Sequence, residues 1–439
     1  MQAVIMAGGK GTRLAALTKD EIPKPMVLVA GKPLLLWQVE RLKENGITDI
    51  IMVVGHLGDK IKDFFGDGLR FGVQIQYFEE TTPLGTAGSF YYLKDILRDD
   101  TFVMMSGDLF FDIDFKKMIE FHREKKAAAT LFVHPNGHPF DSDLLMLSED
   151  GRAVKFDSKH NIRDYWYDNC VNAGIFVFNR KICDRVPEPV KRNLENDIIK
   201  GMIDDGELVY GYRSPEYVKD VGTVERVEQT LADIERGFIS GKCLRQKQKC
   251  IFLDRDGTIN QYRGLIYKEE DFELESCAME AIRKINLSGR LGIVVTNQPV
   301  VARGLCEIED VENIHRKMAT LLGREGVFLD DILFCPHHPD KGYPEENPLY
   351  KIPCGCRKPK TGMIEKAAER YNIDLKESWM VGDTTMDIQT GKNAGMHTAL
   401  VLTGEAGRDK KYDVQPDLIC SDLLEAVERI LGTQGGGHI

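Results

Sequence analysis

The sequence has 439 residues, which is too long for one ordinary core and fits two domains of roughly 200 residues each. Hydrophobic residues make up 42 % of it and charged residues 29 %, a composition that excludes a disordered or fibrous chain. The formal net charge of −11 argues against nucleic acid as a partner, because phosphate backbones need a basic surface. Any phosphate group is therefore expected to bind locally.

The first residues, MQAVIMAGGKGTRL, enter an apolar strand and a glycine loop without a basic leader or a cleavage site. No apolar run approaches the roughly 20 residues that a bilayer span needs. We therefore expect a soluble, cytoplasmic protein with no membrane partner. The ten cysteines are scattered, and in the cytoplasm this pattern favours thiols and one metal site over disulfides.

Strand-like and helix-like runs alternate along both halves of the chain. The first half predicts a helix over Pro33–Asn45 between strands, and the second half restarts after the polar stretch GFISGKCLRQKQK. The pattern predicts an α/β class with two Rossmann-like domains and mostly parallel sheets. Predicted strands span 3–6, 50–54, 102–105, 250–253, 292–295, 332–334, 379–381 and 398–401. We expect domains at 1–238 and 249–432, a linker at 239–248 and a disordered tail at 433–439.

A glycine loop, MAGGKGTRL at residues 6–14, directly follows the first strand, where bare backbone N–H groups can cradle phosphate oxygens. Its spacing matches neither the Walker A pattern nor the dinucleotide fingerprint, and an ordinary tight turn would look the same. Arg13 follows, and EIPKPM at residues 21–26 holds Lys24 between two prolines. Together these residues resemble the signature of sugar-phosphate nucleotidyltransferases.

That resemblance implies where nucleotide and magnesium would bind. The glycine loop would grip the triphosphate, Lys24 would neutralise the phosphates that approach each other, and PLGTAG at residues 83–88 would hold the base. Asp108, in SGD after a predicted strand, and Asp220, in KDVGT, would hold Mg²⁺. The residues expected to bind the nucleotide are Gly8, Gly9, Gly11, Thr12, Arg13, Gly85 and Thr86.

Further runs of the first half resemble the sugar pocket of the same family. VNAGIFVFN and LENDII would supply Asn172, Gly174 and Glu195 as hydroxyl or ribose contacts. Asp112 and Asp114 are interpreted as structural, with Asp114 as the N-cap of a helix that begins FKKMIEF. The aromatic run over residues 165–167 either packs or stacks on a sugar.

Two aspartates one residue apart end the strand in FLDRDGTIN, residues 252–260. Alone, such a pair is often a turn, but this one resembles the haloacid-dehalogenase phosphatase signature. Asp254 would attack phosphorus, and Asp256 would act as general acid and then activate water. The other motifs of that family follow in order, with Thr296 to bind the phosphoryl group, Lys358 as catalytic lysine and Asp383 for Mg²⁺. Asp254 and Asp256 are also expected at the magnesium.

CPHHP and CGC lie between these motifs. Cys335, His337, Cys354 and Cys356 form a Cys₃His set that suits a tetrahedral, structural Zn²⁺, with His338 as the spare imidazole; the alternative is unligated thiols. Phosphatases with these motifs resemble the heptose bisphosphate phosphatase family, with histidinol phosphate phosphatases as near relatives. The resemblance places Asn297, Gln298, Arg303 and Arg357 at the substrate, although Pro299, Val300 and Val301 depart from the family's small residues.

The first half is similar to heptose 1-phosphate guanylyltransferases, and mannose and glucose enzymes share most of its motifs. Removal of the 7-phosphate from heptose 1,7-bisphosphate leaves the 1-phosphate that such a transferase needs. The sequence therefore predicts sugar phosphates and a nucleoside triphosphate, GTP above all, as substrates, and a homo-oligomer stays open. The alternatives are a hexose 1-phosphate transferase joined to another phosphatase, and a chain in which one domain only senses sugar nucleotide.

Overall fold

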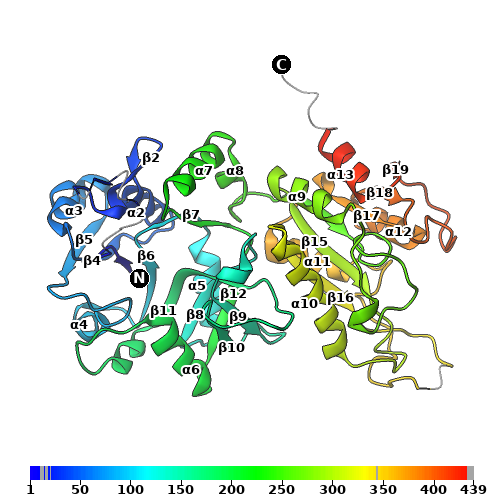
Figure 1. Cartoon of the computed structure of the whole chain (residues 1–439), viewed down its shortest axis with the longest axis horizontal. Coiled ribbons are helices and arrows are strands. Elements are labelled where there is room, and N and C mark those ends of the chain that lie inside the picture. The colour runs from blue at the N-terminus through cyan, green and yellow to red at the C-terminus, as the bar shows by residue number, and fades with distance from the viewer. Residues whose placement is uncertain (10–13, 15–17, 20, 343–344, 433–439) are drawn as a thin grey trace. The chain divides into compact units, whose positions relative to one another are not determined.

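The computed structural model describes residues 1–9, 14, 18–19, 21–342 and 345–432, and it divides the chain into two compact units (Figure 1). The first unit comprises Met1–His134, Ser142–Asn161 and Cys170–Arg245. The second comprises Pro135–Asp141, Ile162–Asn169 and the chain from Gln246 onward. The predicted tail at 433–439 and the predicted triphosphate residues Gly11, Thr12 and Arg13 lie outside the described residues.

A nine-stranded sheet forms the centre of the first unit, with the order β10-β9-β11-β6-β1-β4-β5, and β8 and β12 continuing from β11. β1 is parallel to β4 and β6, and β4 is parallel to β5, whereas β11 runs antiparallel to β6 and β8. The sheet is therefore mixed. Its strands are β1 (Gln2–Met6), β4 (Asp49–Val54), β5 (Gln74–Glu79), β6 (Thr101–Ser106), β8 (Ala129–His134), β9 (Leu144–Leu147), β10 (Ala153–Asp157), β11 (Val171–Asn179) and β12 (Val209–Arg213).

The central strands of this sheet are apolar on both sides because both faces are covered. In β4, Ile51 and Val53 belong to one apolar cluster, whereas Ile50, Met52 and Val54 belong to another. Such unbroken apolar runs are typical of buried parallel strands. The helices of this unit are α2 (Leu34–Glu44), α3 (Gly58–Phe65), α4 (Phe90–Ile96), α5 (Phe115–Glu124), α6 (Lys200–Asp204), α7 (Val224–Glu235) and α8 (Phe238–Gly241).

Two small antiparallel ribbons complete the first unit, β2 (Leu28–Val29) with β3 (Lys32–Pro33) and β7 (Leu109–Asp112) with β13 (Tyr217–Asp220). The second ribbon brings the predicted ligands Asp108 and Asp220 to one place, because Asp220 pairs with Leu109. The helix α8 begins at Phe238, directly before the stretch 239–248 predicted as a linker, and within that stretch Ile239, Cys243 and Leu244 are buried.

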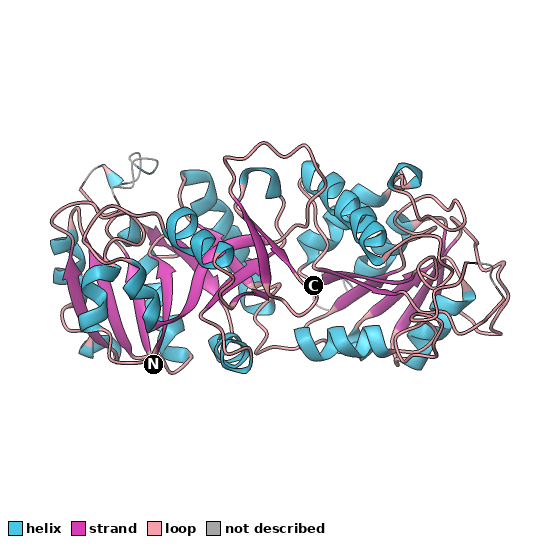
Figure 2. Cartoon of the chain, turned by 90° about the horizontal axis from the view of Figure 1, so that it is seen from below, coloured by secondary structure: helices cyan, strands magenta, loops and turns pink. Residues whose placement is uncertain are grey.

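The second unit has a six-stranded, all-parallel sheet with the order β16-β15-β14-β17-β18-β19. Figure 2 shows helices on both of its faces, as parallel strands with crossover helices require. Its elements are β14 (Cys250–Leu253), α9 (Ala278–Ser288), β15 (Leu291–Asn297), α10 (Ile308–Arg324), β16 (Asp331–Cys335), α11 (Gly362–Tyr371), β17 (Trp379–Gly382), α12 (Thr385–Asn393), β18 (His397–Val401), β19 (Leu418–Cys420) and α13 (Leu423–Gly432).

The expectation of two α/β units, one with a mixed and mostly parallel sheet, is confirmed.

Val300 and Val301, which depart from the expected small residues, are fully buried and pack with Val311 of α10. Within the described residues, no helix is both long and apolar enough to span a membrane.

Candidate active sites

Three carboxylates meet at the carboxyl end of the parallel sheet in the second unit. Asp254 follows β14 and Asp383 follows the neighbouring strand β17, so parallel pairing places both at the same edge. Asp387 lies one turn into α12, where it forms a capping box with Thr384. Each of the three aspartates offers an oxygen within 4.8 Å of the others.

Lys358 is the cation of this cluster, and its side chain is 2 % exposed. Its Nζ lies 2.9 Å from Oδ1 of Asp254 and 2.5 Å from Oδ1 of Asp387. Burial lowers the pKa of the ammonium group, but Asp254 and Asp387 outweigh burial and raise the pKa above its ordinary value. Lys358 is therefore charged while it faces two carboxylates.

One lysine does not balance three carboxylates. Burial and the charge of Asp387 raise the pKa of Asp254 to about 6, and the same two causes raise the pKa of Asp383 to about 8. Oδ1 of Asp383 is buried and has no hydrogen-bond partner among the described residues. Unpaired buried carboxylate oxygens are the ligands that a hard divalent cation takes, so these residues fit Mg²⁺.

The other predicted catalytic groups surround this cluster. Asp256 accepts hydrogen bonds from the guanidinium group of Arg255 and from Nδ2 of Asn260 at 3.1 Å. Thr296 is buried at the end of β15, and Nε2 of Gln298 donates to its Oγ1 at 3.0 Å and to Oδ2 of Asp256 at 2.8 Å. The motifs of one expected active site, far apart in the sequence, thus converge.

Asp387 is a functional candidate that the sequence reasoning missed. The motif VGDTTMD was recognised and only Asp383 was assigned from it, although Asp387 closes the same motif. Asp387 lies four positions after Asp383, in the first turn of a helix, and this spacing brings its carboxylate back toward that of Asp383. The four-residue spacing of the two aspartates is the signal from which Asp387 could have been predicted. The group that could hold a metal comprises Asp254, Asp383 and Asp387, and the carboxylate of Asp256 lies outside it.

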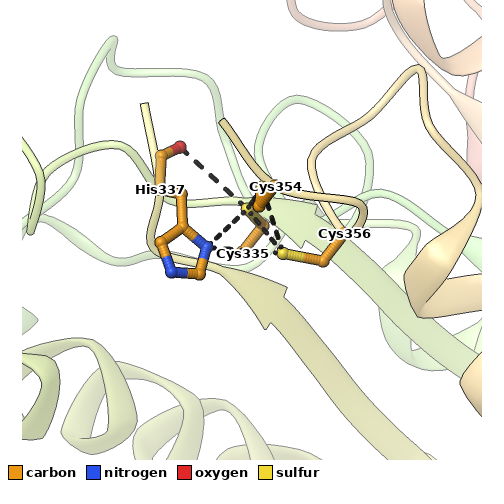
Figure 3. Close-up of side chains that lie close together, drawn as sticks. All are labelled: Cys335, His337, Cys354 and Cys356. Atoms are coloured by element: carbon orange, nitrogen blue, oxygen red, sulfur yellow. Dashed lines mark hydrogen bonds between the residues drawn. The ribbon is translucent and has the colours of Figure 1, made fainter. Parts of the chain in front are cut away.

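A second group of side chains, Cys335, His337, Cys354 and Cys356, lies close together (Figure 3). The three sulfurs are 3.1 to 3.5 Å apart, and Nδ1 of His337 lies 3.4 Å from the sulfur of Cys356 and 3.7 Å from that of Cys335. These distances approach the roughly 3.7 Å between ligands of a tetrahedral zinc ion with bonds near 2.3 Å. Three cysteine sulfurs and one imidazole nitrogen fit a closed zinc site.

Arg357 and Lys358, which directly follow Cys356, connect the Cys₃His cluster to the carboxylate cluster along the chain. Nη1 of Arg357 donates to the carbonyl of His337 at 3.1 Å, and Lys358 is the next residue. His338 is not part of the cluster, because its Nδ1 accepts from the backbone N–H of Asp340 at 3.2 Å. Arg303 lies in a turn, where its N–H donates to the carbonyl of Pro299 at 2.9 Å.

In the first unit, Lys24 lies between the two predicted metal ligands. Its Nζ donates to Asp108 and lies 3.9 Å from Oδ1 of Asp220, and Arg226 of α7 pairs with Asp220. Oδ1 of Asp220 is buried without a hydrogen-bond partner among the described residues. Burial alone would raise the pKa of Asp108, but Lys24 and Ser106 hold it below its ordinary value. The carboxylates of Asp108 and Asp220, which lie at one edge, fit a hard cation.

Comparisons with known proteins support both units. A family model described as Nucleotidyl transferase matches residues 2–237, and one described as HAD-hydrolase-like matches residues 355–426. The D-glycero-beta-D-manno-heptose-1,7-bisphosphate 7-phosphatase of Haemophilus ducreyi is 36 % identical over 182 residues, which are 41 % of this chain and 97 % of that protein. The chain belongs to the nucleotidyl transferases and to the HAD-like hydrolases. Both expected families are confirmed, and we call the first unit the transferase unit and the second the hydrolase unit.

Two further relatives resemble the chain over about half its length. The mannose-1-phosphate guanylyltransferase of Mycobacterium tuberculosis is 35 % identical over 246 residues, 56 % of this chain and 67 % of that protein. A probable glucose-1-phosphate cytidylyltransferase of Bacillus subtilis is 31 % identical over 237 residues, 48 % of this chain and 89 % of that protein. The chain thus spans only about two thirds of the length of the guanylyltransferase.

The predicted nucleotide loops of the transferase unit lie near β1 and β5. A Cβ on Gly8 would lie 3.3 Å from Oε2 of Glu80, which directly follows β5. Gly85 has a φ of +75°, and a Cβ there would meet the carbonyl oxygen of Arg192 at 2.4 Å. Close packing against that backbone is therefore one reason for a glycine at position 85. Thr86 accepts from the N–H of Leu194 at 2.7 Å.

The predicted sugar contacts lie on two elements of the transferase unit. Asn172 and Gly174 are on β11, where the N–H of Gly174 donates to Oδ1 of Asn172 at 3.3 Å. Glu195 is in the first turn of a π-helix, Leu194–Ile199, and burial raises its pKa. Gly9, in the glycine loop that follows β1, has no atom within 4 Å of the position that a Cβ would take.

Other expectations of the sequence concern packing. Asp114 is the N-cap of α5 and accepts from the N–H of Lys116 at 3.1 Å, as predicted. Asp112 pairs with Arg41 and Arg245. In the aromatic run, the N–H of Tyr167 donates to Oγ1 of Thr320 on α10 at 2.9 Å, so Tyr167 packs within the hydrolase unit.

Proposed function

We propose that the chain is a bifunctional enzyme of nucleotide-activated heptose synthesis. The hydrolase unit removes the 7-phosphate of D-glycero-D-manno-heptose 1,7-bisphosphate, and the transferase unit transfers GMP from GTP to the heptose 1-phosphate, giving GDP-heptose and pyrophosphate. The buried cluster of Asp254, Asp383 and Lys358 carries the hydrolytic half. The name of the Haemophilus ducreyi relative supports heptose as its sugar.

The phosphatase step uses two aspartates in succession. An oxygen of Asp254 attacks phosphorus, the bond between phosphorus and the sugar oxygen breaks, and that oxygen takes a proton from Asp256. Water then attacks the aspartyl phosphate and gives a proton back to Asp256, and free phosphate leaves Asp254. Lys358 compensates the charge of Asp254. Mg²⁺ held by Asp254, Asp383 and Asp387, with Asp256 as a further expected ligand, would neutralise phosphate charge.

The transferase step is a displacement at the α-phosphorus of GTP. An oxygen of the sugar 1-phosphate attacks, and the bond to pyrophosphate breaks, so no group has to supply a proton. Both reactants are anions, and cations therefore lower the barrier. Lys24 and Arg13 would supply positive charge, and Mg²⁺ held by Asp108 and Asp220 would add to it.

Glu80 supports guanine as the base. Its carboxylate lies beside Gly8 of the glycine loop, and Oε1 is buried without a hydrogen-bond partner among the described residues. Guanine presents N1–H and N2–H₂ donors side by side, which two carboxylate oxygens can accept, whereas the Watson–Crick edges of adenine and cytosine present acceptors next to their amino groups. Glu80→Gln should therefore lower kcat/KM for GTP more than for the other triphosphates.

We also propose that each activity belongs to one unit. The nucleotidyltransferase domain then spans residues 1–238, the phosphatase domain spans residues 249–432, and residues 239–248 connect them. A structural Zn²⁺ at Cys335, His337, Cys354 and Cys356 would hold the loop that precedes Lys358. We place the enzyme in the cytoplasm, where GTP and sugar phosphates are available.

The test is to incubate the full chain with Mg²⁺, heptose 1,7-bisphosphate and each of five nucleoside triphosphates, and to follow phosphate, pyrophosphate and sugar nucleotide. Both anomers are needed: the relative is named for the beta anomer, whereas we expect GDP-D-glycero-α-D-manno-heptose. GDP-heptose with release of phosphate and pyrophosphate is the expected result. No sugar nucleotide from any triphosphate would reject the proposal.

A second candidate keeps both reactions and changes the sugar. The relatives named for mannose 1-phosphate and glucose 1-phosphate match the transferase half at 35 % and 31 % identity. Mannose and glucose 1-phosphates belong in the same panel, with histidinol phosphate as the alternative phosphatase substrate. A higher kcat/KM for a hexose 1-phosphate than for heptose 1-phosphate would favour this candidate.

A further inference from the structure

Two consecutive amide side chains follow Thr296 at the end of β15, and both were expected to contact the substrate. Gln298 is 2 % exposed, which leaves its amide little access to a sugar. Its Nε2 donates at 2.8 Å to Oδ2 of Asp256 and at 3.0 Å to Oγ1 of Thr296. Both hydrogens of one amide nitrogen thus go to two groups of the proposed reaction.

Asn297 makes the matching contact to the other side of the centre. The backbone N–H of Lys358 donates to its Oδ1 at 3.0 Å, and its Nδ2 donates to the carbonyl of Lys358 at 3.2 Å. This pair of bonds fixes the main chain from which the lysine projects. The Lys358 ammonium group then lies 2.9 Å from the nucleophile Asp254.

We propose that Asn297 and Gln298 are positioning residues of the phosphatase reaction, in which Asn297 holds Lys358 and Gln298 holds Asp256 in register with Thr296. The inference rests on the proposed phosphatase function. Asp256 has other donors, Arg255 and Asn260, but both lie within four residues of it in the sequence. Gln298, which directly follows the neighbouring strand β15, is the donor that reaches it from a distant part of the sequence.

The two contacts serve different steps of the reaction. Lys358 offsets negative charge while Asp254 attacks phosphorus, so a displaced lysine slows formation of the aspartyl phosphate. Asp256 gives a proton to the sugar oxygen in the first step and takes one from water in the second, so with a leaving group that needs no proton a displaced Asp256 slows only hydrolysis of the aspartyl phosphate. A misplacement of about 1 Å can cost on the order of 100-fold in rate. With such a leaving group, loss of Asn297 should therefore slow formation of the aspartyl phosphate, and loss of Gln298 should slow its hydrolysis.

The experiment uses the full chain with Mg²⁺ and p-nitrophenyl phosphate, whose leaving group needs no proton. Gln298→Leu should show a burst of p-nitrophenolate and then a steady rate about 10- to 100-fold below that of the unchanged chain, because phosphoenzyme accumulates. Asn297→Leu should lose rate to a similar degree without a burst. KM for p-nitrophenyl phosphate should fall together with the steady rate in Gln298→Leu, because slow hydrolysis of the phosphoenzyme lowers both, whereas KM for heptose 1,7-bisphosphate should not rise more than threefold in either variant. The control Gln415→Leu, at an exposed position, should keep the original rate.

Two results would overturn the inference. One is a raised KM for heptose bisphosphate with unchanged turnover of p-nitrophenyl phosphate, since this would make the two amides sugar ligands. The other is the same burst behaviour in both variants. If a leucine variant does not fold, Gln298→Met and Asn297→Ser take its place and are judged by the same two measurements. A chain that turns over neither substrate before substitution would instead reject the proposed phosphatase function.

Discussion

In the transferase centre each carboxylate has a cation of its own, whereas in the hydrolase centre three carboxylates share one lysine. Lys24 pairs with Asp108 and Arg226 pairs with Asp220, and Lys24 keeps the pKa of Asp108 low. Around Lys358, by contrast, burial and neighbouring carboxylates raise the pKa of Asp383 to about 8. Burial and mutual repulsion therefore oppose ionisation of the hydrolase carboxylates, whereas Lys24 favours ionisation of Asp108. We infer that the hydrolase centre depends more on a bound cation for its stability.

The sharpest test of two separate centres is a pair of substitutions. Asp254→Asn removes the nucleophile and should lower phosphate release by at least about 1000-fold while nucleotidyl transfer from supplied heptose 1-phosphate continues. Asp108→Asn removes a metal ligand of the other centre and should do the reverse. Coupled assays of phosphate and pyrophosphate measure both on the same preparation. Loss of both activities in either soluble variant would contradict independent centres.

The zinc cluster should set the stability of the hydrolase unit alone. Structural zinc can contribute on the order of 10 kcal/mol to folding, so Cys356→Ser should lower the melting temperature of this unit by roughly 10 °C or more. The matched control is Cys306→Ser, at a half-buried cysteine of the same unit outside the cluster. Elemental analysis should find one zinc per chain, and none after Cys356→Ser. A chain that is free of zinc and equally stable would reject the site.

The raised pKa of Asp383 predicts an unusual stabilising substitution. At pH 7 the unfolded chain ionises Asp383 whereas burial and Asp387 oppose its ionisation in the folded chain, so without divalent metal Asp383→Asn should raise the unfolding free energy of this unit by about 1 to 2 kcal/mol. Added Mg²⁺ should stabilise the unchanged chain, as any ligand of the native state does, and stabilise Asp383→Asn much less. Thermal unfolding with and without Mg²⁺ measures both effects. Asp413→Asn, at an exposed position, is the control and should change neither.

Three of the residues that the sequence predicted for the hydrolase centre lie at strand ends. Asp254, Thr296 and Asp383 follow apolar runs, and parallel strands bring such positions together, so the motifs sufficed. The contacts of Asn297 and Gln298 could not be predicted in the same way. Asn297 bonds to a residue 61 positions away, and Gln298 to one 42 positions away, through a loop whose path depends on tertiary packing.

The transferase unit shows the same limit in its fold. Its parallel strands β1, β4 and β6 were predicted, because they are unbroken apolar runs between helices. VNAGIFVFN was interpreted only as part of a sugar pocket, although it also forms β11, which pairs antiparallel with β6 and β8. Strand direction depends on connections that leave no local pattern, so the mixed part of the sheet needed the structure.

A further effect on stability concerns a buried carboxylate that the transferase unit holds outside its centre. Glu216 is 1 % exposed, accepts hydrogen bonds from the N–H groups of Asp114 and Leu244, and has its pKa raised by burial to about 7. The folded chain therefore binds this proton more tightly than the unfolded chain does. The unfolding free energy of this unit should fall as pH rises from about 4.5 to 7, by at most about 3 kcal/mol.

Glu216→Gln should remove this fall, because the amide stays neutral and keeps an oxygen for the two N–H groups. At pH 8 the variant should be more stable than the unchanged chain by about 1 to 2 kcal/mol, and at pH 5 the two should be equal or nearly so. Urea unfolding can be followed by Trp37, which packs on Phe110 in this unit, after Trp166 and Trp379 are replaced by Phe. The control Glu228→Gln, at an exposed position on α7, should keep the fall. If Glu216→Gln unfolds with the same pH dependence as the unchanged chain, the raised pKa of Glu216 is not the cause of that dependence. The contrast between a transferase centre with paired carboxylates and a buried carboxylate of raised pKa elsewhere in the same unit would then be wrong.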